Sequence, residues 1–351
     1  MNVLEKTIAR IEPLDGDAMA AARARQDVLT KPQGSLGRLE ELSIQMAGIQ
    51  GRAIPRVVDK AIITMAGDHG VTRDGVSAYP AEVTPQMVLN FLSGGAGINV
   101  LARHVGARVV VVDMGVAVDL PPHPQLVVKK VGPGTASLLA GPAMSREQAV
   151  QAVEAGIAVV ETEVAKGLDV VGTGDMGIGN TTPSSAIVAA ITGRPVTEVT
   201  GRGTGLDDTG LSLKVAVIER ALAVNRPNPV DALDVLAKVG GFEIAGLAGV
   251  ILGAAANRVA VVVDGFISGA AALIAVGLAP AVRPYLIAGH RSVEGGHTYA
   301  LAHMDLEPVL DLRLRLGEGT GAALAISIVE AATKVLAEMA TFADAGVSEK
   351  Q

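Results

Sequence analysis

A glutamate between two glycines is the first candidate for chemistry. In LRLRLGEGTGAALAISIVEAA (312–332), Glu318 stands between Gly317 and Gly319, just before a strongly apolar stretch. Glycine neighbours give a carboxylate little side-chain cover, so it can face a ligand and accept a proton. Glutamate is also common at a helix N-terminus, where the helix dipole stabilises it. From this segment alone, a catalytic base and a simple helix cap are equally good interpretations.

A glycine loop in GTGDMGIGNTTPSSAIVAAI (172–191) predicts a phosphate cradle. Gly177 and Gly179 let backbone N–H groups approach an anion at the start of a helix, and Asn180 and Thr181 add side-chain donors. The loop has neither the lysine of a P-loop nor the spacing of a dinucleotide fingerprint, so neither a nucleoside triphosphate nor NAD follows from it. The alternative is an ordinary strand-to-helix turn.

A second glycine turn lies in VTGRGTGLDDTGLSLK (199–214). Its glycines ahead of an acidic helix start are Gly201, Gly203 and Gly205. Lys214 is about two turns into that helix, within reach of an anion held near its start. Two glycine turns and one lysine suit a single monophosphate. Asp207 and Asp208 are a possible metal pair, but acids in a first helical turn are more often stabilised there by the dipole.

The histidines give only a weak case for metal. His290, His297 and His303 lack the i, i+4 spacing that places two imidazoles on one helical face, and the chain has no cysteine to complete a thiolate site. We therefore expect no catalytic metal and no other cofactor. HRSVEGGH (290–297) is interpreted as a loop after the last strand that forms part of the pocket wall, and the role of His69 is left open.

Short runs of β-branched residues, each ending in a glycine, an acid or a histidine, predict an open and mostly parallel sheet with helices on both faces. These runs cover residues 61–68, 107–115, 168–175, 258–265 and 283–290. Ala-rich segments of helical length separate them, and this alternation is typical of α/β proteins. Because ligands bind outside the carboxyl ends of such strands, the residues that follow the runs are the site candidates. They are Asp68, His69, Asp113, Asp175, Asp264, Gly265 and His290.

Both ends of the chain are predicted to be helical, and after residue 306 the helix is expected from Thr320 to about Phe342. The first fifty residues have no strand signal, and Gly34 or Ser35 is the expected cap of a helix that follows. We expect residues 1–55 and 306–351 to form a small helical domain beside a large parallel α/β domain of residues 56–305.

Composition excludes several classes of protein. Aromatic residues make up 2% and there are 42 glycines, so the core must be built from small aliphatic side chains, as in parallel α/β proteins. A net charge of −7 argues against a nucleic-acid partner. The charged start lacks an export signal, so a cytoplasmic location is expected. The uncharged stretch 265–282 is interpreted as a buried crossover helix, and no membrane is expected.

Several long segments together resemble one family, the nicotinate-nucleotide:dimethylbenzimidazole phosphoribosyltransferases of cobalamin lower-ligand assembly. The segments are KPQGSLGRLE (31–40), AGDHGV (66–71), GVSAYPAEVTPQMVLNFLSGGAGINVLAR (75–103), GDMGIGNTT (174–182), GRGTGLDD (201–208), DGFISGAAAL (264–273), HRSVEGGH (290–297) and LDLRLRLGEGTGAALA (310–325). They run over nearly the whole chain, and so many ordered segments are far more specific than one glycine loop.

The resemblance implies a sheet domain with a small helical domain, usually in a homodimer, and one site for nicotinate mononucleotide and dimethylbenzimidazole or a related azole base. The family's catalytic glutamate falls on Glu318. Asp175, where members carry Asp or Glu, is the candidate helper carboxylate. The implied nucleotide-binding residues are Gly177, Ile178, Gly179, Asn180, Thr181, Gly201, Gly203, Thr204, Gly205, Lys214, Asp264 and Gly265. The implied wall for the flat base is Ser77, Tyr79, Gln86, Met176 and Leu316.

The chemistry of such a transfer fits these residues. Nicotinate bound to C1′ is a pyridinium, which leaves without protonation and without a metal. Attack by one imidazole nitrogen from the opposite face makes the other N–H acidic, and a carboxylate can remove that proton. We expect the helix start to keep Glu318 ionised. The alternatives are a Mg²⁺-dependent transferase of pyrophosphate-activated ribose, with Asp207 and Asp208 as metal ligands, and a nucleotide-binding protein without catalysis.

Overall fold

The computed structural model describes residues 1–348, and these contain a seven-stranded sheet in the order β3-β2-β1-β4-β5-β6-β7. All neighbouring strands are parallel, which confirms the predicted open sheet. The strands are β1 (Lys60–Gly67), β2 (Arg108–Gly115), β3 (Leu126–Val128), β4 (Val170–Met176), β5 (Ala260–Val263), β6 (Leu286–His290) and β7 (Pro308–Leu310). The sequence did not predict β3 and β7, because each edge strand has only three residues.

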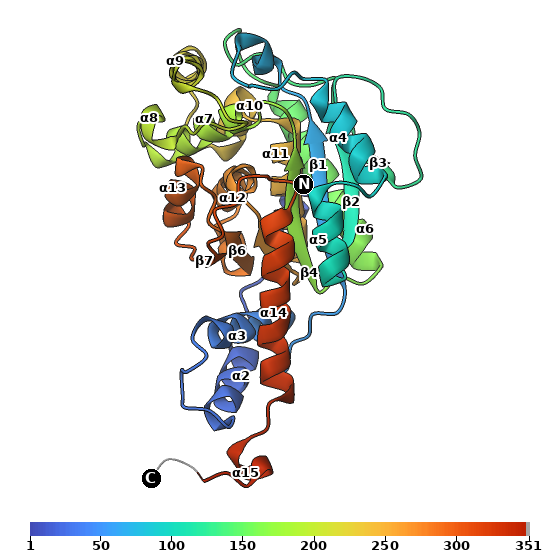
Figure 1. Ribbon diagram of the computed structural model, residues 1–351, viewed down its shortest axis with the longest axis vertical. Helices are drawn as coiled ribbons and strands as arrows, with labels where there is room; N and C mark the ends of the chain where they lie inside the picture. The colour runs from blue at the N-terminus through green and yellow to red at the C-terminus, as the bar shows by residue number, and fades with distance from the viewer. Residues whose placement is uncertain (349–351) are drawn as a thin grey trace.

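Helices surround this sheet (Figure 1). They are α1 (Val3–Ala9), α2 (Gly16–Val28), α3 (Arg38–Gln50), α4 (Val83–Leu92), α5 (Gly97–Val105), α6 (Arg146–Ala165), α7 (Thr181–Thr192), α8 (Val196–Val199), α9 (Asp208–Asn225), α10 (Ala232–Val239), α11 (Phe242–Ala256), α12 (Phe266–Leu278), α13 (Gly295–His303), α14 (Thr320–Glu338) and α15 (Phe342–Ala345). Two short 3₁₀ helices are Gly70–Asp74 and Pro280–Tyr285.

The two faces of the sheet carry different helices because strand side chains alternate. On one face, Met65 of β1 lies against Gly246 of α11, and α6 and α12 pack on α11. On the other face, Ile62 of β1 lies against α14, which also contacts α5. The core is therefore covered on both sides, as the sequence predicted.

Glycine allows α6 and α11 to pack unusually closely. A Cβ added at Gly156 of α6 would lie 1.9 Å from the carbonyl oxygen of Gly246, and one at Gly249 would lie 2.0 Å from the carbonyl oxygen of Val153. Real Cβ atoms do not approach backbone that closely, so these positions require glycine. The glycine-rich, aromatic-poor composition thus has a direct structural cause.

The uncharged stretch at 265–282 forms α12, a buried helix that connects the parallel strands β5 and β6. This confirms the predicted crossover helix. Within residues 1–348, α14 is the one helix long and apolar enough to cross a membrane. Its buried residues pack on β4, β5, β6 and the helices α3 and α5, which accounts for its apolar composition.

Segments from the two ends of the chain lie side by side in the lower part of Figure 1, where α2 and α3 flank α14. The Thr30 N–H donates to the Ala340 carbonyl at 3.0 Å, and the Arg25 guanidinium donates to the Leu336 carbonyl at 2.6 Å. However, α1 packs on α6 and α11 instead, with the Leu4 N–H bonded to Glu154. The two-domain division remains a prediction, and residues 349–351 of the predicted small domain lie outside the described residues.

Of two predictions about the helices near the chain ends, the N-terminal one is wrong in detail. The helix expected to be capped by Gly34 or Ser35 begins at Arg38 with Gly37 as its N-cap, because residues 34–37 form a turn that is closed by a Gly37 N–H to Gly34 carbonyl bond. After residue 306 the chain forms β7 and an irregular loop, and α14 then begins at Thr320, which confirms the predicted start of the C-terminal helix; α14 ends at Glu338, a few residues before the predicted end.

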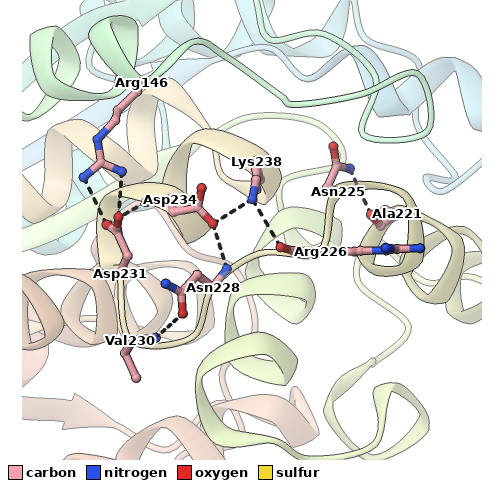
Figure 2. A network of polar contacts seen from close by, with 9 residues as sticks. All are labelled: Arg146, Ala221, Asn225, Arg226, Asn228, Val230, Asp231, Asp234 and Lys238. Atoms are coloured by element: carbon pink, nitrogen blue, oxygen red, sulfur yellow. Dashed lines mark hydrogen bonds and ion pairs between the residues drawn. The ribbon is translucent and has the colours of Figure 1, made fainter.

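A polar network fixes the connection between α9 and α10 (Figure 2). Arg146, at the start of α6, makes a two-point ion pair with Asp231 at 2.8 and 3.2 Å. Asp234 accepts bonds from the Lys238 ammonium and from the Asn228 N–H. The connection is thereby tied to the start of α6, and the Lys238 ammonium also donates to the carbonyl of Arg226, the C-cap of α9, at 3.2 Å.

The close approach of α6 and α11 can be tested by adding one methyl group. Gly156→Ala should lower the free energy of unfolding by roughly 1–3 kcal/mol, despite the better helix propensity of alanine, because backbone must move. Gly16→Ala, where a Cβ would meet nothing within 4 Å, is the control and should change stability by less than about 0.5 kcal/mol. Urea unfolding measures both, and an unchanged Gly156→Ala protein would contradict the packing.

Candidate active site

A cavity of about 480 Å³ opens at the carboxyl edge of the sheet. It contains most of the residues that the sequence predicted for the site: Ser77, Tyr79, Asp175, Met176, Gly177, Ile178, Gly179, Asn180, Thr181, Gly203, Thr204, Gly265, Leu316 and Glu318. The loops that follow β4, β5 and β6 all contribute, as expected for an open parallel sheet. Segments that are far apart in the sequence therefore form one site.

The other predicted site residues do not line the cavity: Gln86, Gly201, Gly205, Lys214 and Asp264. Gln86 lies on the exposed side of α4, whose Val83 and Met87 face the cavity instead. Lys214 and Asp264 are fully buried behind the wall.

The main chain of Glu318 is fixed to the ends of two strands. Its N–H donates to the Asp175 carbonyl at 3.2 Å, and its carbonyl accepts from the Thr64 hydroxyl at 2.9 Å. Its φ is 64°, a left-handed conformation that costs a non-glycine residue energy and recurs at functional sites. The side chain is 5% exposed, and its Oε2 accepts from the Ile98 N–H of α5 at 2.9 Å. Oε1 receives no hydrogen bond from residues 1–348.

Asp264, and not Glu318, satisfies the start of α14. Its two carboxylate oxygens accept from the Gly319 N–H at 3.3 Å and the Ala322 N–H at 2.9 Å. The interpretation of Glu318 as the cap of α14 is therefore wrong. The Glu318 carboxylate accepts one hydrogen bond from a backbone N–H, that of Ile98 in α5, and it otherwise faces the cavity.

Burial raises the pKa of Glu318, and the nearby charge of Asp264 adds to this, against the Ile98 N–H that lowers it. The helix start therefore does not lower the pKa of Glu318, because desolvation outweighs the backbone donor, and an ionised Glu318 stays a prediction. Burial also raises the pKa of Asp175 well above its ordinary value, with Asp264 as the next cause. Asp175 Oδ2 accepts from Asn180 at 2.9 Å, while Oδ1 has no partner among the described residues.

The two glycine turns meet at one end of the cavity. A Cβ on Gly203 would lie 2.8 Å from Thr181 Oγ1 and 3.0 Å from Lys214 Nζ, so the second turn lies directly against the first. Lys214 Nζ donates to Thr181 Oγ1 at 2.6 Å, and burial lowers the Lys214 pKa to about 8. The start of α7 has no side-chain cap. A helix N-terminus with a lysine behind it is suited to one phosphate group.

Glu294 is a support that sequence reasoning missed. Its Oε1 accepts from the Gly203 N–H at 2.9 Å, and its Oε2 would lie 2.0 Å from a Cβ on Gly201. The Glu294 carboxylate therefore supports the second glycine turn, through its hydrogen bond to Gly203 and its close packing against Gly201. Its position inside the loop 290–297, next to two glycines, was the available signal.

Another part of the cavity wall is apolar. Tyr79 and Leu316 stand at the mouth, 56% and 61% exposed. Further in, the sequence missed a group of apolar residues: Val76, Val83, Met87, Phe266 and Ile267. The i, i+4 spacing of Val83 and Met87 was a signal for one helical face. Such walls suit a flat apolar ring.

The three buried histidines have distinct environments. His69 Nε2 lies next to Gly177 and forms a hydrogen bond with Glu243 at 2.7 Å. Burial alone would lower the pKa of His69, but the charge and the hydrogen bond of Glu243 outweigh burial, and the pKa is raised. His297 Nδ1 accepts from the Ser292 N–H, and burial lowers its pKa to about 3, which keeps it neutral. His290 lines the cavity with Ser292 and Glu294, in agreement with the expected wall.

The adjacent acids Asp207 and Asp208 both have structural partners. Asp207 is the N-cap of α9 and accepts from the Gly210 N–H at 2.7 Å, whereas Asp208 pairs with Arg202 at 2.5 Å. The capping interpretation of this pair is confirmed for Asp207. Both side chains lie outside the cavity lining.

Comparison with known proteins agrees with this geometry. A family model described as phosphoribosyltransferase matches residues 11–347, and a phosphate cradle beside a buried carboxylate suits that class of enzyme. The nicotinate-nucleotide–dimethylbenzimidazole phosphoribosyltransferase of Roseiflexus sp. (strain RS-1) is 69% identical over 350 residues, which cover 100% of this chain and 99% of the relative. The protein of the same name from Chloroflexus aurantiacus is 67% identical over 350 residues, which cover 100% of this chain and 100% of that relative.

A solved structure extends the likeness to three dimensions. The crystal structure of the corresponding protein from Thermus thermophilus has a TM-score of 0.91 and 46% identity, with 96% of this chain and 100% of that chain covered. The chain belongs to the nicotinate-nucleotide–dimethylbenzimidazole phosphoribosyltransferase family. The resemblance seen in the sequence is thereby confirmed.

The assignment of the α14 cap to Asp264 predicts a difference between two variants. Asp264→Ala should lower the free energy of unfolding by about 1–3 kcal/mol, because it leaves buried N–H groups without an acceptor. Glu318→Gln, which keeps an oxygen for the Ile98 N–H, should unfold at nearly the parent's urea concentration. If both substitutions lowered the free energy of unfolding equally, the assignment of the α14 cap to Asp264 alone would be contradicted.

Proposed function

We propose that this chain transfers the phosphoribosyl group of nicotinate mononucleotide to dimethylbenzimidazole or a related azole base, with release of nicotinate. The observation that carries the proposal is the position of Glu318. Its buried carboxylate lines one cavity together with the residues of the two glycine turns and with apolar walls. The printed names of the relatives give the two substrates.

The phosphate of the donor would bind at the two glycine turns. Gly177 to Thr181 and Gly203 supply backbone N–H groups, and Lys214 reaches the same place through Thr181. This anchor fixes the 5′ end of the donor. The ribose then extends along the cavity toward Glu318, so that C1′ faces the apolar walls.

The acceptor base would lie between the apolar walls, with Met176 and Leu316 beside the ring and Tyr79 at the mouth. The Thr204 hydroxyl lies 3.2 Å from that of Ser77, so the base side and the phosphate side are directly connected. Binding both substrates in one rigid cavity replaces a bimolecular encounter by an aligned pair.

The transfer itself requires one proton acceptor. One ring nitrogen of the azole forms the bond to C1′ as the C1′–pyridinium bond breaks, and the electron pair of that bond neutralises the departing nicotinate ring. The other ring N–H is then acidic, and Glu318 takes its proton. Attack opposite the leaving group inverts C1′ and gives an α-linked riboside phosphate. A raised pKa makes Glu318 a stronger base, provided that the pH lies above it.

Asp175 is a second buried carboxylate of the cavity. Burial and its acidic neighbours raise its pKa well above the ordinary value. Because burial favours the protonated form of Asp175, it limits the negative charge that builds up beside Glu318. We therefore assign Asp175 a supporting role, and we keep the homodimer and the cytoplasmic location as predictions.

Removal of the base is the first test of this mechanism. Glu318→Gln should bind both substrates but release nicotinate about 10²–10⁴ times more slowly, since the amide cannot accept the proton. The parent's kcat should decline with falling pH through an apparent pKa above the ordinary 4.5, because burial raises it. The residual activity of the variant should lack this decline. The same acid limb in the variant would assign the proton acceptor elsewhere, with Asp175 next.

The phosphate anchor gives a second test, in which Lys214→Met keeps the length of the side chain and removes its charge. Nicotinate mononucleotide should bind about tenfold to a hundredfold more weakly, the usual loss for a hydrogen bond to a charged group. The affinity of the parent should decline as the pH rises above about 8, where Lys214 loses its proton, and the variant should show no such decline. Calorimetry on both sides of that pH measures the effect, with dimethylbenzimidazole as the unaffected control. Equal nucleotide affinity would remove Lys214 from the site.

A further inference from the structure

His290 is a buried imidazole without a hydrogen bond at the end of β6. It is 2% exposed and lines the cavity. Its Nδ1 has no partner among the described residues, and its Nε2 lies 3.8 Å from Asp264 Oδ1, beyond hydrogen-bond distance. Buried polar groups in native proteins are nearly always paired, so an unpaired one in a cavity wall indicates a ligand that completes it.

Two glycines fix the orientation of this ring. A Cβ on Gly265 would lie 3.1 Å from Nε2, and one on Gly321 would lie 1.9 Å from Cδ2. The imidazole therefore fills the space that side chains at these positions would need. Because the carboxylate of Asp264 lies on the Nε2 side, the proton is favoured there, and Nδ1 is left as an acceptor.

His290 is linked to both chemical parts of the cavity, Glu318 and the glycine turns. On one side, Asp264 connects it to the Gly319 N–H, directly after Glu318. On the other side, the same loop continues to Glu294, which holds Gly203 at the phosphate cradle. A phosphoribosyl group that joins these parts places its ribose beside His290.

We propose that Nδ1 of His290 accepts a hydrogen bond from one of the two ribose hydroxyls of the donor nucleotide and thereby holds C1′ opposite the acceptor base. This role rests on the proposed function. The hydroxyl supplies the missing donor for Nδ1. The other buried histidine of this loop, His297, accepts the Ser292 N–H at Nδ1. Its Nε2 also has no partner among the described residues, but its ring does not line the cavity, so it is a matched control for an unpaired imidazole outside the site.

The test compares nicotinate mononucleotide with its 2′-deoxy and 3′-deoxy analogues. In the parent, loss of one particular hydroxyl should lower kcat/KM about tenfold, the usual effect of one hydrogen bond. His290→Ala should use the intact nucleotide about tenfold less well and should no longer distinguish it from that analogue. His290→Asn, whose amide lies near the position of Nδ1, should recover part of the discrimination. His297→Asn should discriminate as the parent does.

The outcomes separate this inference from the proposed function. If the parent releases nicotinate with the same kcat/KM from all three nucleotides, neither ribose hydroxyl is recognised and the role of His290 is wrong. This outcome is obtained with the parent protein alone. If His290→Ala keeps the parent's discrimination, another residue reads the hydroxyl. If the parent releases no nicotinate from the intact nucleotide, the proposed function fails, and the role of His290 fails with it.

Discussion

The structure depends on the attachment of the Glu318 main chain to the carboxyl ends of β1 and β4. The Thr64 hydroxyl and the Asp175 carbonyl bond to its carbonyl and N–H. Gly174 of β4 must be glycine, since a Cβ there would lie 2.3 Å from the Glu318 carbonyl oxygen. These contacts hold Glu318 in a left-handed conformation that costs of order 1 kcal/mol or more. The sheet, and not only α14, therefore sets the position of the carboxylate.

Three buried carboxylates lie at the same carboxyl edge of the sheet, and they determine the electrostatics of the site. Asp175, Asp264 and Glu318 are all nearly inaccessible to solvent, and each has a raised pKa because burial disfavours its charged form. Asp264 receives backbone donors from α14, whereas Glu318 has one donor from α5. Asp264 is therefore fixed in place by the start of α14, whereas Glu318 lines the cavity with one carboxylate oxygen free of hydrogen bonds from residues 1–348.

The sequence predicted the elements whose signal is local. Long β-branched runs predicted β1, β2 and β4 closely, and the glycine loop after β4 was placed at the cavity where it was expected. The three-residue edge strands were too short to produce a pattern. The family resemblance indicated Glu318, but the segment alone did not distinguish a base from a cap, because that depends on which acid reaches the start of α14. The answer, Asp264, comes from another strand.

Contacts between distant segments could not be predicted in the same way. Glu294 holds Gly203 across 91 residues, and Gln86 lies on the outer side of α4 although its neighbour Met87 faces the cavity. Helix rotation and loop packing decide such details, and neither has a signature in one sequence. The roles of the predicted site residues in binding and catalysis remain proposals.

The most direct measurement of the central claim uses an acceptor that has no proton to lose. In 1,5,6-trimethylbenzimidazole, a methyl group replaces the ring N–H, so attack on C1′ creates a cation that needs no base. If Glu318 is the proton acceptor, Glu318→Gln should slow transfer to dimethylbenzimidazole by about 10²–10⁴ but should slow transfer to the methylated base far less. An equal loss with both acceptors would contradict the assignment and would leave Glu318 with an electrostatic or structural role.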